Sequence, residues 1–404
     1  MQQNPLDPVH EFHVIIVGGA HGLQKSQHGI SYIVVDRETG PRNRNWGVTI
    51  NWAHTLLDEI LPPRLRAELA SCQPDESLDI DAVGIDYALI RNGATGEPIA
   101  TPRSPGMRRL NIQKTKRNWG EGLDIHYGKK LVDIEVLESG VIAHFSDGTS
   151  ETGTVIVGAD GASSRVRNWL LGDEKGTPEV LPYAFMNIPT TYTAEQARYL
   201  ESISNPFVDV GAHPKNMYMG FFLLDKPDHA RPETWVFYIL ASWRIGDQED
   251  IENSPNRLER LRRRMDGWAD PFASAVRWLP DDTMIGADQL KTWQPREKWD
   301  NRGGRVTLAG DAAHTMTFHR GQGGNTAIRD AFEYVKAMVE VRDGKKELQH
   351  AVDVYDTDVF ERGEEVERSR QAMMAFDDFA NFTKSPVLKI GMTPQGTQSG
   401  RESS

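Results

Sequence analysis

Four short runs rich in Val, Ile and Leu constrain the fold of this chain more than any other feature. They occupy residues 13–17, 32–35, 154–157 and 305–309, and each is followed by a glycine or an aspartate. Short apolar runs that do not alternate with polar residues are typical of parallel strands buried on both faces of a sheet. The sequence therefore predicts a layer of the α/β class that binds a nucleotide.

The segment between residues 181 and 290 has a different pattern. It contains aromatic-rich runs at residues 185–188, 217–224 and 235–240, and aromatic residues favour β-strands. We expect these runs to form a second, mostly antiparallel sheet that is inserted into the first layer. Helical spacing of apolar residues predicts helices over 52–65, 258–278, 325–341 and 353–379.

The predicted domain organisation is discontinuous. Residues 1–180 and 291–345 are expected to form two parts of one nucleotide-binding domain, 181–290 the inserted sheet domain, and 346–404 a C-terminal helix followed by a loose tail. No internal repeat is evident.

Composition argues against several classes of protein. The net charge of −12 speaks against a nucleic-acid partner, because a phosphate backbone demands clustered Lys and Arg. The single cysteine, Cys72, permits neither a disulfide framework nor a cysteine-based metal site, and the scattered histidines predict no metal site of their own. No apolar stretch approaches the roughly 18 residues that span a bilayer, and residues 1–12 do not resemble a signal peptide. We therefore expect a cytoplasmic protein without a membrane span.

The first candidate site combines Gly18, directly after the first strand, with Asp36, directly after the second. In a dinucleotide-binding fold, such an acid accepts hydrogen bonds from a ribose and the glycine-rich turn faces the pyrophosphate. The G-x-G-x-x-G spacing is not met, because Ala20 and Leu23 stand where glycines would be required. Residues 23–28 are also too short and too polar for a packed crossover helix. An ordinary strand–helix–strand unit without a nucleotide explains this segment equally well.

Two later strings carry stronger signals. Asp160 lies in the string 158–167, where small residues end a strand and serines open a helix, which suits close approach of the backbone to a charged ligand. A helix-capping role for Asp160 is the plain alternative. Asp311 follows the strand 305–309, and the glycine-rich string 320–328 follows in turn, with Gly324 just before the expected helix. The amides of a helix N-terminus favour negative charge at such a place.

Taken together, the strings 158–161, 310–311 and 320–324 resemble the DG and GD motifs of the class A FAD-dependent monooxygenases. This is the para-hydroxybenzoate- and salicylate-hydroxylase-like family, and the resemblance is closest to its fungal secondary-metabolism branch. It implies an FAD-binding Rossmann-like domain with an inserted, mostly antiparallel β-sheet substrate domain and a C-terminal helix. It also implies FAD and NAD(P)H as cofactors, and molecular oxygen and an aromatic or polyketide-like small molecule as partners in a hydroxylation.

The resemblance also implies roles for single residues. Gly18 would lie at the pyrophosphate turn and Asp36 would bind the adenosine ribose. Gly47 would lie near the cofactor, and Asp160 would serve both FAD and NAD(P)H. Asp311 and Gly324 would hold the ribityl–pyrophosphate portion and the flavin edge. Ile112 stands where the family tends to place an arginine that contacts FAD, and Arg109 is the nearest substitute.

Candidate catalytic residues come from the aromatic segment. Tyr218, Tyr238 and His213, and less directly Trp243, could orient a phenol or assist its deprotonation, although each is better explained as a core residue with one satisfied polar end. The resemblance leaves several reactions open: a hydroxylase, an epoxidase or a decarboxylating hydroxylase. A halogenase is disfavoured, because the Trp-x-Trp-x-Ile-type signature expected of one is not found. An impaired or inert member with weakened FAD binding is a further alternative, suggested by the shortened first turn. The string 310–324 argues against a plain nicotinamide dehydrogenase, because such an enzyme does not require it.

Overall fold

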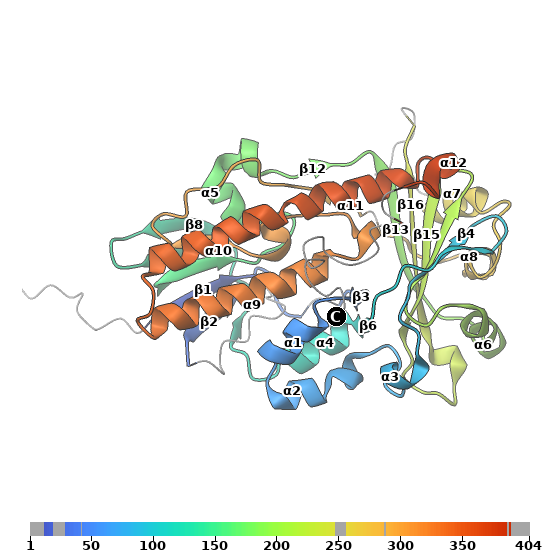
Figure 1. Cartoon of the computed structure of the whole chain (residues 1–404), viewed down its shortest axis with the longest axis horizontal. Coiled ribbons are helices and arrows are strands. Elements are labelled where there is room, and N and C mark those ends of the chain that lie inside the picture. Colours follow the sequence, from blue (N-terminus) through green and yellow to red (C-terminus); the bar gives the residue numbers. More distant parts are fainter. Residues whose placement is uncertain are drawn as a thin grey trace, which may run out of the picture.

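The computed structural model describes residues 12–18, 29–41, 43–246, 256–286, 288–385 and 388. A parallel sheet lies toward one end of the molecule and a larger sheet lies at the other (Figure 1). Helices α10 (Leu348–Arg362) and α11 (Glu364–Ala375) follow one another along the molecule from the first sheet toward the second. The shortened turn predicted after Gly18 falls on residues 19–28, which lie outside the described residues.

The parallel sheet has the strand order β18-β11-β1-β2-β7. Its strands are β1 (His13–Val17), β2 (Ser31–Val35), β7 (Ile125–His126), β11 (Val155–Gly158) and β18 (Val306–Leu308). In register, Val17 pairs with both Val35 and Gly158, and Gly158 pairs with Leu308. The four predicted apolar strands are therefore confirmed, and their carboxyl ends meet at one edge of the sheet.

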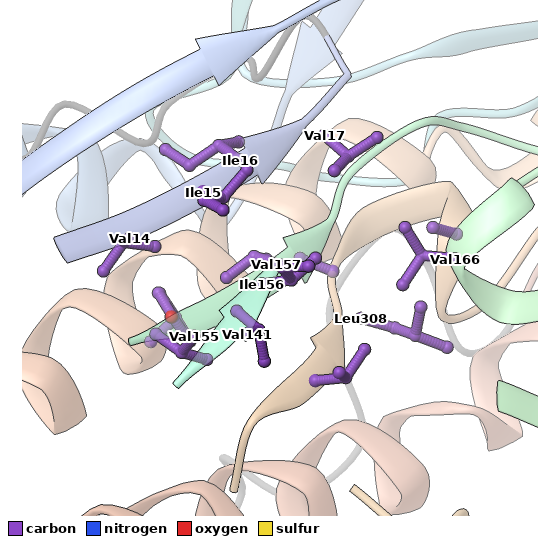
Figure 2. Packing of buried hydrophobic residues seen from close by; sticks show 14 of the residues in the cluster. Val14, Ile15, Ile16, Val17, Val141, Val155, Ile156, Val157, Val166 and Leu308 are labelled. Carbon is purple, nitrogen blue, oxygen red and sulfur yellow. The ribbon is translucent and has the colours of Figure 1, made fainter. Parts of the chain in front are cut away.

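A dense apolar core holds this sheet in place. Val14, Ile15 and Ile156 are fully buried, and they belong to one apolar cluster with side chains such as Val166 and Leu308 (Figure 2). Helices α5 (Arg165–Gly176), α9 (Gly323–Arg342) and α10 contribute further side chains to the same cluster, as does the sheet β10-β9-β8. Burial of each large aliphatic side chain stabilises the fold by roughly 1.5–3 kcal/mol, which fixes the strand ends that carry the candidate site.

The second sheet has the order β13-β16-β15-β14-β4-β5. Its strands are β13 (Tyr183–Thr190), β14 (Asp209–His213), β15 (Met217–Asp225), β16 (Val236–Arg244), β4 (Leu89–Asn92) and β5 (Pro98–Ala100). Every pairing is antiparallel except that of β14 with β4, so the expected mostly antiparallel sheet is confirmed. The sheet reaches beyond the expected segment 181–290, because β4 and β5 come from the earlier part of the chain.

The two faces of this sheet pack against different partners. One face packs against α6 (Ala194–Ile203), α7 (Arg257–Arg264) and α8 (Phe272–Arg277). The other face carries Tyr218, Phe222 and Tyr238 and belongs to a cluster with Met107, Phe376 and Phe382. A small two-stranded sheet of β3 (Gly47–Ile50) and β6 (Arg108–Asn111) lies between the two large sheets (Figure 1).

Three predicted helices are each divided. The helix expected over 52–65 is α1 (His54–Ile60) and α2 (Pro63–Ala67), because a proline cannot continue the hydrogen-bonding of a preceding helix. The helix expected over 258–278 is α7 and α8, which begins after Pro271. The long helix expected over 353–379 is α10 and α11, divided at Gly363, which packs against Pro295.

The remaining elements are short connections. They are α3 (Ile80–Val83), α4 (Ile112–Trp119), α12 (Phe379–Phe382), β8 (Leu131–Val136), β9 (Val141–Phe145), β10 (Ser150–Gly153), β12 (Glu179–Val180), β17 (Lys291–Thr292) and the 3-10 turns Leu69–Cys72, Pro232–Thr234, Gly310–Ala312 and Phe318–Arg320. Among the described residues, none of the helices combines the length and apolar character needed to cross a bilayer, and no three His, Cys, Asp or Glu side chains gather as a metal site would require.

Candidate functional site

A cleft of about 1960 Å³ opens at the carboxyl edge of the parallel sheet. Four residues that follow four different strands line it, namely Gly18 after β1, Asp36 after β2, Asp160 after β11 and Asp311 after β18. The carboxyl edge is where open α/β sheets bind ligands. The volume exceeds the roughly 300–1,000 Å³ typical of small-molecule pockets, so the cleft suits an extended ligand.

Gly18 permits the close approach of β1 to the turn after β11. Its φ is +108°, and a Cβ there would lie 2.5 Å from the carbonyl oxygen of Ala159 and 2.6 Å from the Cα of Asp160. Its amide donates to the carbonyl of Val35 at 2.8 Å. No residue with a side chain fits this conformation without moving the neighbouring turn, so Gly18 keeps the floor of the cleft open.

Asp36 ends β2 and lies half-buried at the cleft. Its backbone amide donates to the carbonyl of His126 at 2.9 Å, and its Oδ1 accepts a hydrogen bond from the amide of Glu38 at 2.9 Å. A carboxylate can accept several hydrogen bonds, so Asp36 retains capacity for hydroxyl groups of a ligand.

Asp160 caps the helix that follows it. It accepts hydrogen bonds from the hydroxyl of Ser164 at 2.5 Å and from the amide of Arg165 at 2.6 Å. Burial raises the pKa of Asp160, and these hydrogen bonds oppose that shift. The capping role considered from the sequence is therefore present, and the same side chain also lines the cleft.

Arg167 joins the two turns that carry Asp160 and Asp311. Its side chain is fully buried and donates to the carbonyls of Ala162 at 2.6 Å, Gly176 at 2.7 Å and Ala312 at 3.0 Å. Its guanidinium also lies over the ring of Trp293, 4.6 Å from the centroid. One side chain thus fixes the spacing of two walls of the cleft. The sequence did not reveal this role, because four of its five hydrogen-bond acceptors are backbone carbonyls.

Asp311 projects from the turn before α9 into the cleft. A Cβ on Gly323 would lie 3.7 Å from its Oδ1, so the carboxylate stands beside the N-terminus of α9. A Cβ on Gly324 would lie 2.6 Å from Cγ2 of Val48, which explains the glycine by close packing of α9 on β3. Gly324 itself does not line the cleft.

Two buried polar residues of α9 hold this arrangement. Asn325 accepts from the amide of Asn51 at 2.8 Å and donates to the carbonyls of Thr49 at 3.0 Å and Gly321 at 2.8 Å. Asp330 accepts from the amide of Gly310 at 2.7 Å. Asp330 also contacts Nε2 of His314 at 2.8 Å and forms an ion pair with Arg362 at 2.9 Å. His314 is therefore a structural residue, whereas Asp330 gave no signal in the sequence beyond its place on the helix.

Basic side chains contribute to the lining of the cleft. The lining includes Arg37, Arg44, Lys114, Lys116, Arg117, Lys129, Lys130 and Arg165. Several pair with acids, as Lys129 does with Asp147 at 2.8 Å, but their number favours a polyanionic ligand such as a pyrophosphate. They are dispersed in the sequence, so no single motif pointed to them.

Gly47 and Arg109 lie outside the cleft, on the ribbon of β3 and β6. A Cβ on Gly47 would lie 2.4 Å from Nη2 of Arg109, so the glycine leaves room for the guanidinium. Arg109 instead lines a separate recess of about 240 Å³. Ile112 is buried at the start of α4, and the next residue, Gln113, lines the cleft.

Tyr218 and Tyr238 lie close to Arg109, whereas His213 does not share their surroundings. Both tyrosines are buried on the face of the sheet toward β3 and β6, and burial raises the pKa of Tyr238 to about 12. His213 stacks on Trp268 with ring centroids 4.6 Å apart. Its Nδ1 accepts from the amide of Lys215 and its Nε2 lies 3.2 Å from the carbonyl of Gly267. These contacts occupy both nitrogens of His213.

The remaining candidate is Trp243, and His319 lies beside Tyr218 with ring centroids 4.9 Å apart. His319 contacts the hydroxyl of Ser242 at 3.0 Å through Nε2 and stacks on Phe318, and burial lowers its pKa to about 3. Trp243 is buried in the opposite cluster, with Arg264 over its ring. Neither residue lines the cleft.

Comparisons with known proteins agree with this geometry. Residues 114–370 match the protein family described as FAD binding domain. The chain is 35% identical to FAD-dependent monooxygenase phnB of Penicillium herquei over 95% of each protein. It is 31% identical to FAD-dependent monooxygenase cctM of Talaromyces islandicus over 94% of this chain and 96% of that protein.

Solved structures share the fold. Klebsiella pneumoniae HpxO complexed with FAD and uric acid has a TM-score of 0.70 at 18% identity, covering 94% of this chain and 92% of that one. The 2,6-dihydroxypyridine-3-hydroxylase of Arthrobacter nicotinovorans has a TM-score of 0.68 at 18% identity, covering 96% and 95%. The expected fold class, with its nucleotide layer and inserted sheet, is thereby confirmed.

Proposed function

Because this chain belongs to the FAD-binding family of FAD-dependent monooxygenases, we propose that it hydroxylates an aromatic or polyketide-like small molecule with FAD, NAD(P)H and molecular oxygen. The reaction would belong to secondary metabolism, as the resemblance to fungal enzymes indicates. The observation that carries the proposal is the cleft at the carboxyl edge of the parallel sheet, where Gly18, Asp36, Asp160 and Asp311 converge.

The residues present fit an FAD molecule. The close approach of Gly18 to Asp160 leaves a floor that a Cβ would fill. Asp36 would accept hydrogen bonds from the adenosine ribose, and Asp311 from the ribityl hydroxyls beside the N-terminus of α9. The basic side chains that line the cleft would compensate the negative charge of the pyrophosphate. When bound, the flavin supplies the redox and oxygen chemistry, and the protein supplies position, charge and exclusion of water.

The second sheet would provide the substrate side of the site. Its inner face is apolar and aromatic, with Tyr218, Phe222 and Tyr238 in one buried cluster. Such a surface excludes water and stacks on a planar substrate. Gly47 on the neighbouring ribbon would lie near the cofactor, as the family resemblance implies.

A visible spectrum tests the proposal directly. The purified protein, incubated with FAD and desalted, should retain a flavin spectrum, and aromatic substrates should then stimulate oxidation of NADPH or NADH. Asp311→Asn should weaken FAD binding in a fluorescence titration, because it removes the acceptor charge at the cleft. Asp228→Asn is a suitable control, since Asp228 lies in an exposed turn and pairs only with nearby Arg231 and the amide of Ala230.

A colourless protein at micromolar FAD would overturn the proposed monooxygenase and favour the impaired member. Bound flavin without substrate-stimulated NAD(P)H oxidation across a panel of phenols and polyketide-like aromatics would likewise refute hydroxylation while leaving FAD binding intact. The two outcomes separate the cofactor assignment from the reaction.

A further inference from the structure

The recess of about 240 Å³ beside the second sheet is separate from the large cleft. Its walls are mainly apolar, and the rings of Phe207, Phe221 and Phe237 contribute to them. All three of these side chains are buried. Among the described residues, the linings of the recess and the cleft have none in common. A cavity of about 150 Å³ accommodates benzene, so the recess has room for a flat aromatic molecule.

The recess has an outer and an inner end. Glu201 on α6 is exposed and marks the outer end. Arg109 is buried and marks the inner end. The guanidinium of Arg109 lies 4.2 Å from the centroid of the Phe222 ring, and Phe222 belongs to the same buried cluster as Tyr218. The recess therefore leads from the surface toward the face of the sheet that forms the proposed substrate side of the site.

One lysine joins the two sides of the outer end. Lys226 directly follows β15, and its side chain is 9% exposed. Its Nζ donates to Oδ2 of Asp75 at 3.1 Å and to Oε1 of Glu201 at 2.5 Å. Asp75 belongs to the loop of residues 73–78 and Glu201 belongs to α6, and both acids line the recess. The amide of Lys226 also donates to the carbonyl of Pro74 at 2.8 Å. Lys226 therefore holds the loop 73–78 against α6 and closes the outer end.

A second lysine holds the same loop from the side of the cleft. Lys114 lines the cleft and forms ion pairs with Glu76 at 3.1 Å and Asp225 at 2.8 Å. Its Nζ also donates to the carbonyl of Gln73 at 3.1 Å. The loop 73–78 thus lies between the cleft and the recess, with one lysine on each side. Ion pairs with exposed acids such as Glu76 contribute little free energy, so the loop can open without disturbing the apolar cores.

We propose that the loop 73–78 is a gate, and that the aromatic substrate reaches its site through the recess when the ion pairs of Lys226 with Asp75 and Glu201 open. This inference rests on the proposed function and gives the substrate a route separate from the cofactor cleft. The walls of the route are mainly apolar, and an apolar environment disfavours a charged group. The route therefore suits a planar aromatic molecule that passes in its uncharged form.

Stopped-flow fluorescence with 2-naphthol, a planar and uncharged probe with its own emission, tests the inference on the FAD-loaded protein. Lys226→Met removes both ion pairs and should raise the rate constants of association and dissociation about five-fold each. The affinity should stay within about two-fold of wild type, because a gate changes the path and not the bound state. Lys215→Met is the matched control and should behave like wild type. Lys215 is exposed, pairs with Asp266 at 3.4 Å and does not line the recess.

A second variant narrows the route itself. Leu78 lines the recess from the loop, so the larger side chain in Leu78→Trp should obstruct the passage and slow both rate constants. Urea unfolding identifies the variants that fold, and Leu78→Trp decides alone if Lys226→Met does not.

Four results would overturn the inference. They are no binding of 2-naphthol to the wild-type protein, wild-type rate constants in Lys226→Met, a change in only one of the two rate constants, and complete loss of binding in a folded Leu78→Trp. The last result would make the recess a binding site and not a route. Because the probe reports binding alone, a protein that admits 2-naphthol through the gate but does not oxidise NAD(P)H refutes the proposed reaction and leaves the gate standing.

Discussion

Replacing Arg167 by methionine should destabilise the protein and lower its affinity for FAD. Methionine keeps an apolar stem, but it removes the charge over the ring of Trp293 and the donors that reach Ala162, Gly176 and Ala312. The first and third of these carbonyls belong to the turns that carry Asp160 and Asp311. The substitution therefore tests whether one buried side chain sets the spacing of two walls of the cleft.

The magnitude follows from the contacts. Three carbonyls lose short hydrogen bonds, and an unsatisfied buried acceptor costs about 1–3 kcal/mol. The lower end applies where water can reach a carbonyl, which gives roughly 3 kcal/mol for the three. Loss of the interaction with Trp293 adds about 1 kcal/mol. Methionine does not carry the desolvation penalty of a buried guanidinium, which offsets part of the loss. The expected net loss is about 2–4 kcal/mol in the free energy of unfolding.

Thermal or urea unfolding measures the stability, and a fluorescence titration measures the affinity for FAD. The control is Arg263→Met, because Arg263 is exposed on α7, pairs with Glu259 one turn away and does not line the cleft. The reasoning is refuted if Arg167→Met unfolds within about 0.5 kcal/mol of wild type and binds FAD equally well. Lost stability with unchanged FAD affinity would show that Arg167 supports the fold without positioning the two turns.

Three further substitutions give distinct outcomes. Gly18→Ala should cost about 2 kcal/mol or more in stability and weaken FAD binding, because its Cβ would lie 2.5 Å from a carbonyl oxygen; unchanged FAD affinity would count against the tight approach. His213→Gln should leave turnover unchanged in a steady-state assay, since both ring nitrogens contact neighbours; a large fall in kcat would restore His213 as a catalytic candidate. Burial raises the pKa of Asp356 to about 7, above the value of about 4 expected in the unfolded chain, so the native state holds the extra proton and loses stability as the pH rises from about 4 to 7. Asp356→Asn should therefore gain stability relative to wild type at pH 8 compared with pH 5 in urea unfolding, and an equal difference at both pH values would contradict this.

The strands of the parallel sheet were predictable because their apolar composition indicates burial directly. Strands β1, β2, β11 and β18 are buried on both faces, so nearly every residue in them is apolar, whatever its neighbours are. The helices were less predictable in extent. Pro62 and Pro271 divide two of them, and apolar spacing alone passes over such a break. The parallel pairing of β4 with β14 joins segments far apart in the chain, and no local pattern indicates it.

The sequence predicted those site residues whose position follows from the order of the strands. It did not predict the residues whose role depends on side-chain contacts between distant parts of the chain. Gly18, Asp36, Asp160 and Asp311 each follow a buried strand, and parallel pairing alone suffices to bring them to one cleft. Arg167 illustrates the second case. Its guanidinium donates to carbonyls of two turns that lie about 150 residues apart in the chain, at Ala162 and Ala312. No local pattern indicates that these turns meet around one side chain, because the acceptors are backbone atoms that every residue carries.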